Sequence, residues 1–265
     1  YETLCSHVIT RNDINLPEWK NATFLVRRND LRIQINFEAA INYARDHNQL
    51  IHFICAEDTY KNRPVCGNIR RKYLSVMDTK SNALCGILPL SIGMKIAITT
   101  NICISDGMVN GAQGILRKIV YDTTSTMEEN VNSDGNKAVT FSKPSKYIVI
   151  EILNHNSGPY DHLLPNNVPI YPIKRKCKYT HKIKNGVNIA REFQRTQLPI
   201  TPAFAITEFK CQSTTLKKLE DIMILRPFNQ SKINVKLDPD LRKDLERLEK
   251  CAKITKQLST WPNAV

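Results

Sequence analysis

Basic and aromatic side chains are interleaved between Leu164 and Lys218, and this mixture is the clearest chemical signal in the sequence. The stretch holds eleven basic residues against two acids, Glu192 and Glu208. The basic residues are Lys174, Arg175, Lys176, Lys178, Lys182, Lys184, Arg191, Arg195, Lys210, Lys217 and Lys218. Single-strand binding proteins use this mixture, because cations follow the phosphates while rings stack on bases. The stretch predicts a surface for single-stranded nucleic acid; the alternative is a solvated basic hairpin with core aromatics.

The motifs that hydrolyse a nucleotide triphosphate are absent from the sequence. That chemistry needs a backbone cradle with a Lys and a carboxylate that holds magnesium. The chain has no Gly-Lys dipeptide, hence no P-loop, and no Asp-Glu dipeptide after an apolar strand. The glycine-rich segment from Gly107 to Gly114 stands between predicted strands, so we interpret its glycines as turn and bulge positions.

Metal centres and self-contained hydrolytic sites find no support either. The eight cysteines include no C-x-x-C pair, and the six histidines form no H-E-x-x-H pair. No G-x-S-x-G elbow is present. His47 and His52, the closest histidine pair, are predicted to be exposed loop residues rather than metal ligands. We therefore expect neither a catalytic residue nor a metal site in this chain.

The composition is that of a globular, basic protein. Apolar residues make up 42% and charged residues 24%, and the formal net charge is +13. These proportions allow a sizeable core, and the charge is typical of proteins that meet phosphate backbones. No run of about 18 apolar residues and no signal sequence is present, so we expect no membrane association. We expect the protein in the nucleus or another intracellular, reducing compartment. Because the chain begins at Tyr1 rather than Met, we expect a piece of a longer protein or a processed product.

The elements that must position the basic stretch begin with α/β layering. Residues 22–26 predict a strand, Asn29-Asp30 a helix cap, and Ile51–Ala56 a second strand. Between them, the spacing of apolar residues predicts a helix; these residues are Leu31, Ile35, Ala39, Ile41 and Ala44.

From about residue 88 the sequence changes to short strands separated by Asp-Gly and Asn-Gly turns. The predicted strands are Met94–Thr100, Gly114–Val120, Tyr147–Leu153 and Cys177–Ile183. Strands without intervening helices favour a small antiparallel barrel, with Thr123–Asn136 as its longest exposed loop. After Pro199 the pattern predicts a buried segment at Ala203–Thr207, then a strand at Asp221–Leu225 and an amphipathic helix after Asp238.

Several segments resemble the C-terminal half of Pif-type (superfamily 1B) DNA helicases, especially the fungal and Helitron-like ones. They are Leu88–Asn101, Val109–Ile115, Trp19–Asn36 and Gln197–Leu216. The last of these is similar to the fifth helicase motif of the family, T-x-x-K-S-Q-G-x-T. With Leu225–Thr255, which is similar to the family's terminal helix, the resemblance covers nearly the whole chain.

The resemblance implies the second RecA-like domain of a P-loop NTPase type protein, with an inserted SH3-like antiparallel β-barrel. It places the first part of the RecA-like domain at 1–87, the barrel at 88–196, and the remainder with the C-terminal helix at 197–265. It also implies that Thr207, Lys210 and Gln212 lie at the single-strand track and that Arg27 or Arg28 faces the nucleotide cleft. Lys174, Arg175 and Lys176 join the predicted DNA-binding set from the basic stretch.

The activity implied is ATP-dependent 5′-3′ DNA unwinding, in repair, recombination or Helitron transposition. ATP and magnesium would serve the complete helicase, whose first RecA-like domain would supply the P-loop and the acidic motif. The family's Ser and Gly in the fifth motif are Cys211 and Ser213 here, and the sixth motif with its arginine finger is missing. We therefore expect no ATP hydrolysis by this chain alone. Two alternatives are a standalone single-strand binding module and a mobile-element remnant without function.

Overall fold

The structure is a computed structural model, and it describes residues 22–131, 137–152, 160, 162–182 and 188–207. All of these belong to one compact unit, Asn21–Thr214. The helices are α2 (Asn29–Asp46), α3 (Gly67–Leu74) and the short 3₁₀ helix η3 (Asp78–Lys80). The strands before residue 100 are β1 (Phe24–Val26), β2 (Ile51–Cys55), β3 (Glu57–Tyr60), β4 (Arg63–Pro64), β5 (Ile87–Leu90) and β6 (Lys95–Ile98). The later strands are β7 (Gln113–Val120), β8 (Met127–Val131), β9 (Lys137–Phe141), β10 (Tyr147–Ile152), β11 (Asn167–Ile170), β12 (Ile173–Lys182), β13 (Asn188–Gln197), β14 (Ile200–Pro202) and β15 (Ala205–Thr207).

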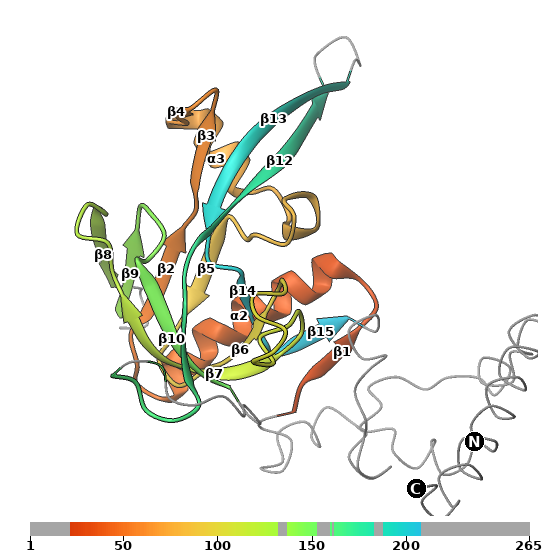
Figure 1. The fold of residues 1–265 in the computed structure, drawn as a ribbon. Coiled ribbons are helices and arrows are strands. Elements are labelled where there is room, and N and C mark those ends of the chain that lie inside the picture. The colour runs from red at the N-terminus through yellow and green to blue at the C-terminus, as the bar shows by residue number, and fades with distance from the viewer. Residues whose placement is uncertain (1–21, 132–136, 153–159, 161, 183–187, 208–265) are drawn as a thin grey trace, which may run out of the picture. The chain divides into compact units, whose positions relative to one another are not determined.

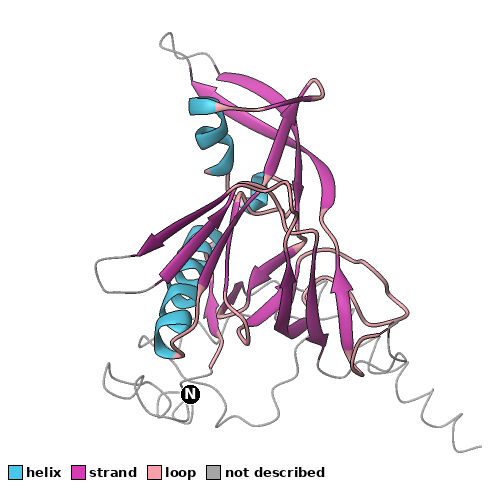
Figure 2. Ribbon diagram, turned by 90° about the vertical axis from the view of Figure 1, so that its left-hand side faces the viewer, coloured by secondary structure: helices cyan, strands magenta, loops and turns pink. Residues whose placement is uncertain are grey.

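The strands form four sheets (Figures 1 and 2), and the main core draws its strand residues from two of them, the five-stranded sheet and the sheet that contains β2. Their orders are β11-β10-β7-β6-β14, β12-β13-β3-β4, β5-β2-β9-β8 and the pair β1-β15. The central strands are rich in β-branched and apolar residues, as in Tyr147–Ile152, which favour a pleated, buried surface. Ile54, Leu116, Ile150 and Ile200 come from different strands and are all fully buried in this core.

The sheets join segments that lie far apart in the sequence. β2 pairs with β5 on one side and, in parallel, with β9 on the other, so Phe53 lies opposite Thr140. β13 pairs with β3, and β14 pairs with β6. Strands of the 88–196 stretch thus pair with strands on both sides of it. The domain boundaries at 87/88 and 196/197 stay predictions.

The α/β class is as the sequence predicts, but the strands that the structure describes do not close into a barrel. Three of the four predicted barrel strands, β6, β7 and β10, are neighbours in the five-stranded sheet, which runs from β11 to β14 in open order. The fourth, β12, belongs to another sheet. The exposed loop predicted at Thr123–Asn136 is also wrong in part, because Met127–Val131 forms β8 against β9. This strand lies at the edge of its sheet and pairs on one side only. Because it carries polar residues such as Glu128 and Glu129, its sequence lacks the apolar pattern by which the other strands were predicted.

The helix predicted after Asn29-Asp30 is present, but its cap differs from the prediction, and two of its four buried residues are polar. The residue before the helix is Arg28, which makes no side-chain cap. The buried positions are Arg32, Asn36, Ala40 and Ala44, at a regular spacing of four. Of the apolar residues at helical spacing, Ala44 is buried and Ile41 packs against the core, whereas Leu31 is 43% exposed. Two polar residues lie on the buried side because each has a partner there.

The glycine-rich segment is confirmed as turns and a close backbone approach. Gly107 and Gly111 have φ angles of 72° and 94°, which other residues rarely adopt. A Cβ at Gly114 would lie 2.6 Å from the carbonyl oxygen of Glu151 on the neighbouring strand. In the same strand pair the register shifts between Val149 and Ile150, so Arg117 is an extra residue on β7, as in a β-bulge.

Candidate nucleic-acid interface

Two predicted site segments meet at one edge of the small parallel sheet. β1 and β15 run in parallel, with Val26 opposite Thr207 at their carboxyl ends. Arg27 and Arg28 follow β1 directly, and Thr207 is the last residue of β15. Residues more than 175 positions apart in the sequence therefore lie at the same sheet edge, beside the start of α2 (Figure 1). Lys210 and Gln212 lie outside the described residues.

The side chain of Asn36 holds this edge in place. Its amide nitrogen donates to the carbonyl oxygen of Ala205 over 3.0 Å, and its amide oxygen accepts from the N–H of Ala205 over 2.7 Å. Asn36 is 3% exposed, so α2 satisfies both backbone groups of a strand residue that water does not reach. The sequence reasoning missed Asn36, and no local signal marks it, since its partner lies 169 residues away.

A second buried contact fixes the first turn of α2. Arg32 donates to the Asp78 carboxylate over 2.5 Å, and both side chains are less than a tenth exposed. Asp78 stands in η3, so this ion pair joins the helix that follows Arg27 and Arg28 to the segment before β5.

The two arginines at the edge differ in their surroundings. Arg28 is exposed and its Nε donates to Asp30 over 3.0 Å, with a further ion-pair contact from Nη2. This hydrogen bond lowers the pKa of Asp30 and raises that of Arg28. Arg27 is exposed, and within the described part of the chain it makes no ion pair. Thr207 is 5% exposed, so its side chain contributes to the packing of the edge.

The basic stretch forms a long antiparallel hairpin of β12 and β13. Successive residues of a strand face opposite sides, so Lys174 and Lys176 share one face while Arg175 faces the other with Cys177. All three basic side chains are exposed. Arg175 donates to the hydroxyl of Thr100 over 3.1 Å. The structure thus divides the three predicted DNA-binding cations between two surfaces.

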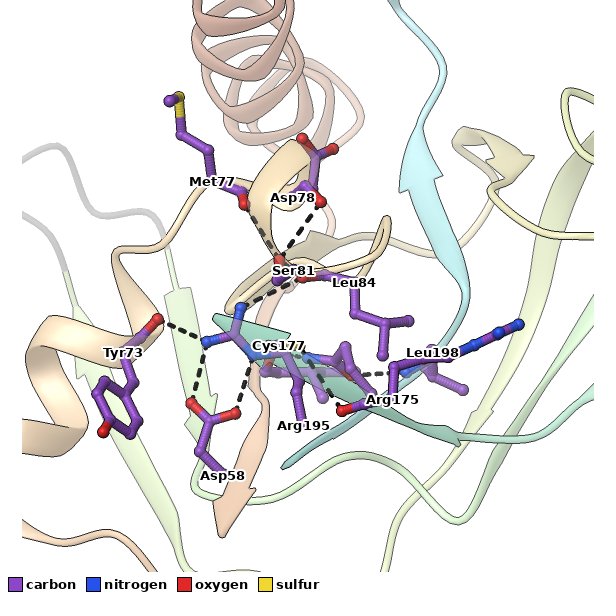
Figure 3. A network of polar contacts seen from close by, with 12 residues as sticks. Asp58, Tyr73, Met77, Asp78, Ser81, Leu84, Arg175, Cys177, Arg195 and Leu198 are labelled. Carbon is purple, nitrogen blue, oxygen red and sulfur yellow. Dashed lines mark hydrogen bonds and ion pairs between the residues drawn. The ribbon is translucent and has the colours of Figure 1, made fainter. Parts of the chain in front are cut away.

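The face of Arg175 and Cys177 covers a small second core. Cys177 and Phe193 pack with Tyr73 of α3, whose ring stacks on that of Phe193 with the centroids 4.3 Å apart. Beside this core, Arg195 is fully buried and bonds to Asp58 on β3 (Figure 3). Although Arg195 belongs to the predicted basic stretch, it is a structural residue that ties the hairpin to β3.

The two histidines also differ from each other. His47 is exposed as predicted, but His52 is 8% exposed in β2, where its Nδ1 lies 2.8 Å from the Tyr121 hydroxyl. Burial lowers the pKa of His52 to about 4.

No group of three His, Cys, Asp or Glu side chains that could hold a metal occurs within the described ranges. Among the helices that the structure describes, none has the length and apolar character to cross a membrane.

No protein-family model matches the chain, and no curated protein matches it. Solved structures do match. The Pif1 helicase from Candida albicans has 16% sequence identity and a TM-score of 0.44, over 88% of this chain and 51% of that chain. The Bacteroides Pif1 bound to ssDNA has 14% identity and a TM-score of 0.46, over 87% of this chain and 46% of that chain. The chain spans about half the length of these proteins, and the structures that it resembles are Pif1 helicases.

Proposed function

We propose that this chain is the C-terminal part of a Pif-type, ATP-dependent 5′-3′ DNA helicase and that it binds single-stranded DNA. In this proposal residues 197–207 and the segment around α2 belong to a second RecA-like domain, and an SH3-like unit is inserted between them. The missing partner is a first RecA-like domain, which would hold ATP and magnesium through its P-loop and acidic motif. The complete protein would act in the nucleus, in repair, recombination or Helitron transposition.

The arrangement of β1 and β15 carries the proposal. Ligands of open α/β sheets bind beyond the carboxyl ends of parallel strands. Both segments that the family resemblance marks, Arg27-Arg28 and the fifth-motif stretch, leave from that end of neighbouring parallel strands. This placement supports a role for Arg27 or Arg28 at a nucleotide cleft and for Thr207, Lys210 and Gln212 at the DNA strand.

The predicted DNA surface is tested by the salt dependence of binding. We expect the chain to bind a fluorescently labelled oligothymidine, with an affinity that falls steeply as salt rises. Replacing Lys174, Arg175 and Lys176 by Ala should weaken binding and flatten the slope, whereas Lys118→Ala on the five-stranded sheet should do so far less. An unchanged slope in the triple variant would place the DNA surface elsewhere, and no binding by the parent chain would favour a remnant without function.

ATP hydrolysis and the size of the native polypeptide distinguish a helicase part from a standalone binding module. The purified chain should show no DNA-stimulated ATP hydrolysis above background, and measurable turnover that survives further purification would contradict the domain assignment. An antibody against residues 164–184 should detect a native band far above 30.3 kDa in source cells. A band at 30.3 kDa with intact DNA binding would instead support the standalone module.

A further inference from the structure

A pocket of about 550 Å³ lies on the other side of the hairpin from Lys174 and Lys176. It is bounded by the turn between β3 and β4, the start of α3, and β13. Its lining includes Tyr60, Lys61, Arg63, Cys66, Ile69 and Arg191. The volume falls within the range of about 300–1,000 Å³ that is typical of small-ligand sites.

The charge of this pocket is positive and uncompensated. Lys61, Arg63 and Arg191 line it, and no carboxylate does so among the described residues. The nearest acid along β3 is Asp58, whose two oxygens are bound by Arg195. On the opposite face of the hairpin, by contrast, Lys178 is paired with Glu192 over 3.5 Å. The pocket therefore offers three cations to an anion.

The same pocket presents aromatic and apolar surface to solvent. Tyr60 is 40% exposed and Ile69 is 48% exposed. These exposed fractions are large for apolar side chains, which usually pack in a core. The ammonium of Lys61 lies 5.6 Å from the centroid of the Tyr60 ring, so positive charge and ring surface stand side by side. A nucleotide needs this combination, because its phosphate is anionic and its base is a flat apolar ring.

Backbone conformation sets Lys61 apart. The β3–β4 hairpin has a two-residue turn, Lys61-Asn62, with φ angles of 48° and 61°. Asn and Gly suit this left-handed region, whereas Lys adopts it at a cost. Because strained residues cluster at ligand sites, the lysine at this turn points to a binding role rather than to the needs of the hairpin.

We propose that this pocket binds one nucleotide, with its phosphate among Lys61, Arg63 and Arg191 and its base against Tyr60. The nucleotide is either a free nucleoside monophosphate or one unit of a DNA strand. The site goes beyond the proposed function, since it lies on the face opposite Lys174 and Lys176. The proposal rests on the proposed function only if the bound nucleotide is one unit of a DNA strand.

Cys66 provides a direct reporter of occupancy, because it is exposed and lines the pocket. The full chain is alkylated with iodoacetamide, and the rate at Cys66 is followed by peptide mass spectrometry. We expect deoxyadenosine monophosphate or a twelve-residue oligodeoxyadenylate to slow the reaction at least threefold. Protection by the mononucleotide identifies a free-nucleotide site, and protection by the oligonucleotide alone identifies a strand site. No protection by either, or equal protection by oligoglutamate, would overturn the proposal.

Variants separate binding from folding. Tyr60→Ala should weaken nucleotide binding by about 5- to 150-fold, the range that one base stacked on a ring accounts for. Lys61→Gly should also reduce Cys66 protection while its midpoint of thermal unfolding stays the same or rises, since glycine suits the turn. A Lys61→Gly chain that is protected as well as the parent would contradict the assignment.

A double variant keeps this result distinct from that of the proposed function. Lys174→Ala with Lys176→Ala should weaken binding of the oligothymidine but leave protection of Cys66 by the mononucleotide unchanged. Conversely, the chain could bind oligothymidine, and lose affinity in the Lys174→Ala, Lys176→Ala variant, while no ligand protects Cys66. That result would overturn the pocket proposal and leave the proposed function intact.

Discussion

Arg195 and Asp58 lie directly opposite each other on β13 and β3, and their fully buried side chains form two parallel hydrogen bonds of 2.9 and 3.0 Å. The remaining donors of Arg195 reach the carbonyl oxygens of Leu84, over 3.2 Å, and Tyr73, over 2.5 Å (Figure 3). One guanidinium thus joins four segments: the hairpin, β3, the end of α3 and the segment before β5. This pair, rather than a surface charge, is what fixes the base of the basic hairpin.

Replacing Arg195 with Met should destabilise the fold by about 3–5 kcal/mol, because the Asp58 carboxylate would remain buried without a cation. Urea unfolding followed by circular dichroism measures the change. The double variant Arg195→Met, Asp58→Leu should recover much of the loss, since it removes the unpaired charge. A cost below about 1 kcal/mol for Arg195→Met, typical of an exposed ion pair, would show that the pair is not buried in solution.

Replacing Asn36 with Ala should cost about 1–3 kcal/mol, the penalty for leaving buried backbone groups without partners. Both the N–H and the carbonyl of Ala205 lose their partner in this variant. The matched control is Gln34→Ala on the exposed side of α2, where Gln34 donates to Glu38 over 3.0 Å. The control should stay within about 0.5 kcal/mol of the parent in urea unfolding. Equal costs for the two variants would argue against the contact between α2 and β15.

His52 should make the fold less stable in acid. Its pKa is about 4 in the folded chain and about 6.5 when exposed, so the unfolded chain binds a proton that the folded chain refuses between these values. The contribution of His52 is complete above pH 6.5, falls as the pH drops toward 4, and changes no further below it. One such group changes the unfolding free energy by at most about 1.4 kcal/mol per pH unit.

The variant His52→Gln isolates this effect, since Gln can still bond to the Tyr121 hydroxyl but does not titrate. Between pH 6.5 and 4, its unfolding free energy should depend less on pH than that of the parent. His47→Gln, at an exposed position, should follow the parent curve. Parallel curves for His52→Gln and the parent would mean that His52 is accessible to protons in the folded state.

The two faces of the hairpin should contribute differently to DNA binding. Because Lys174 and Lys176 share a face, the double alanine variant should reduce the dependence of log affinity on log salt by about 0.7 for each phosphate that is no longer neutralised. Arg175→Ala removes one cation from the other face, where Arg175 bonds to Thr100, and should change the slope less than Lys174→Ala. Fluorescence anisotropy across a salt series measures both. A larger effect from Arg175→Ala would place the bound DNA strand on the hairpin face that carries Arg175 and Cys177.

The sequence by itself determined those features that depend on near neighbours. Helical spacing and strand-forming runs located α2, β2, β7 and β10, and turn chemistry identified the roles of Gly107 and Gly111, because backbone preferences act over a few residues. The basic stretch was visible because its residues lie close together in the sequence.

Only the tertiary structure decided which side of each element is buried and which strands become neighbours. Polar residues such as Asn36 and Arg195 lie inside because partners far away in the sequence satisfy their hydrogen bonds, and spacing cannot reveal such partners. The parallel pairing of β2 with β9 likewise depends on contacts between distant segments. Strand register is set by these contacts, and it places Arg195 opposite both Arg175 and Asp58.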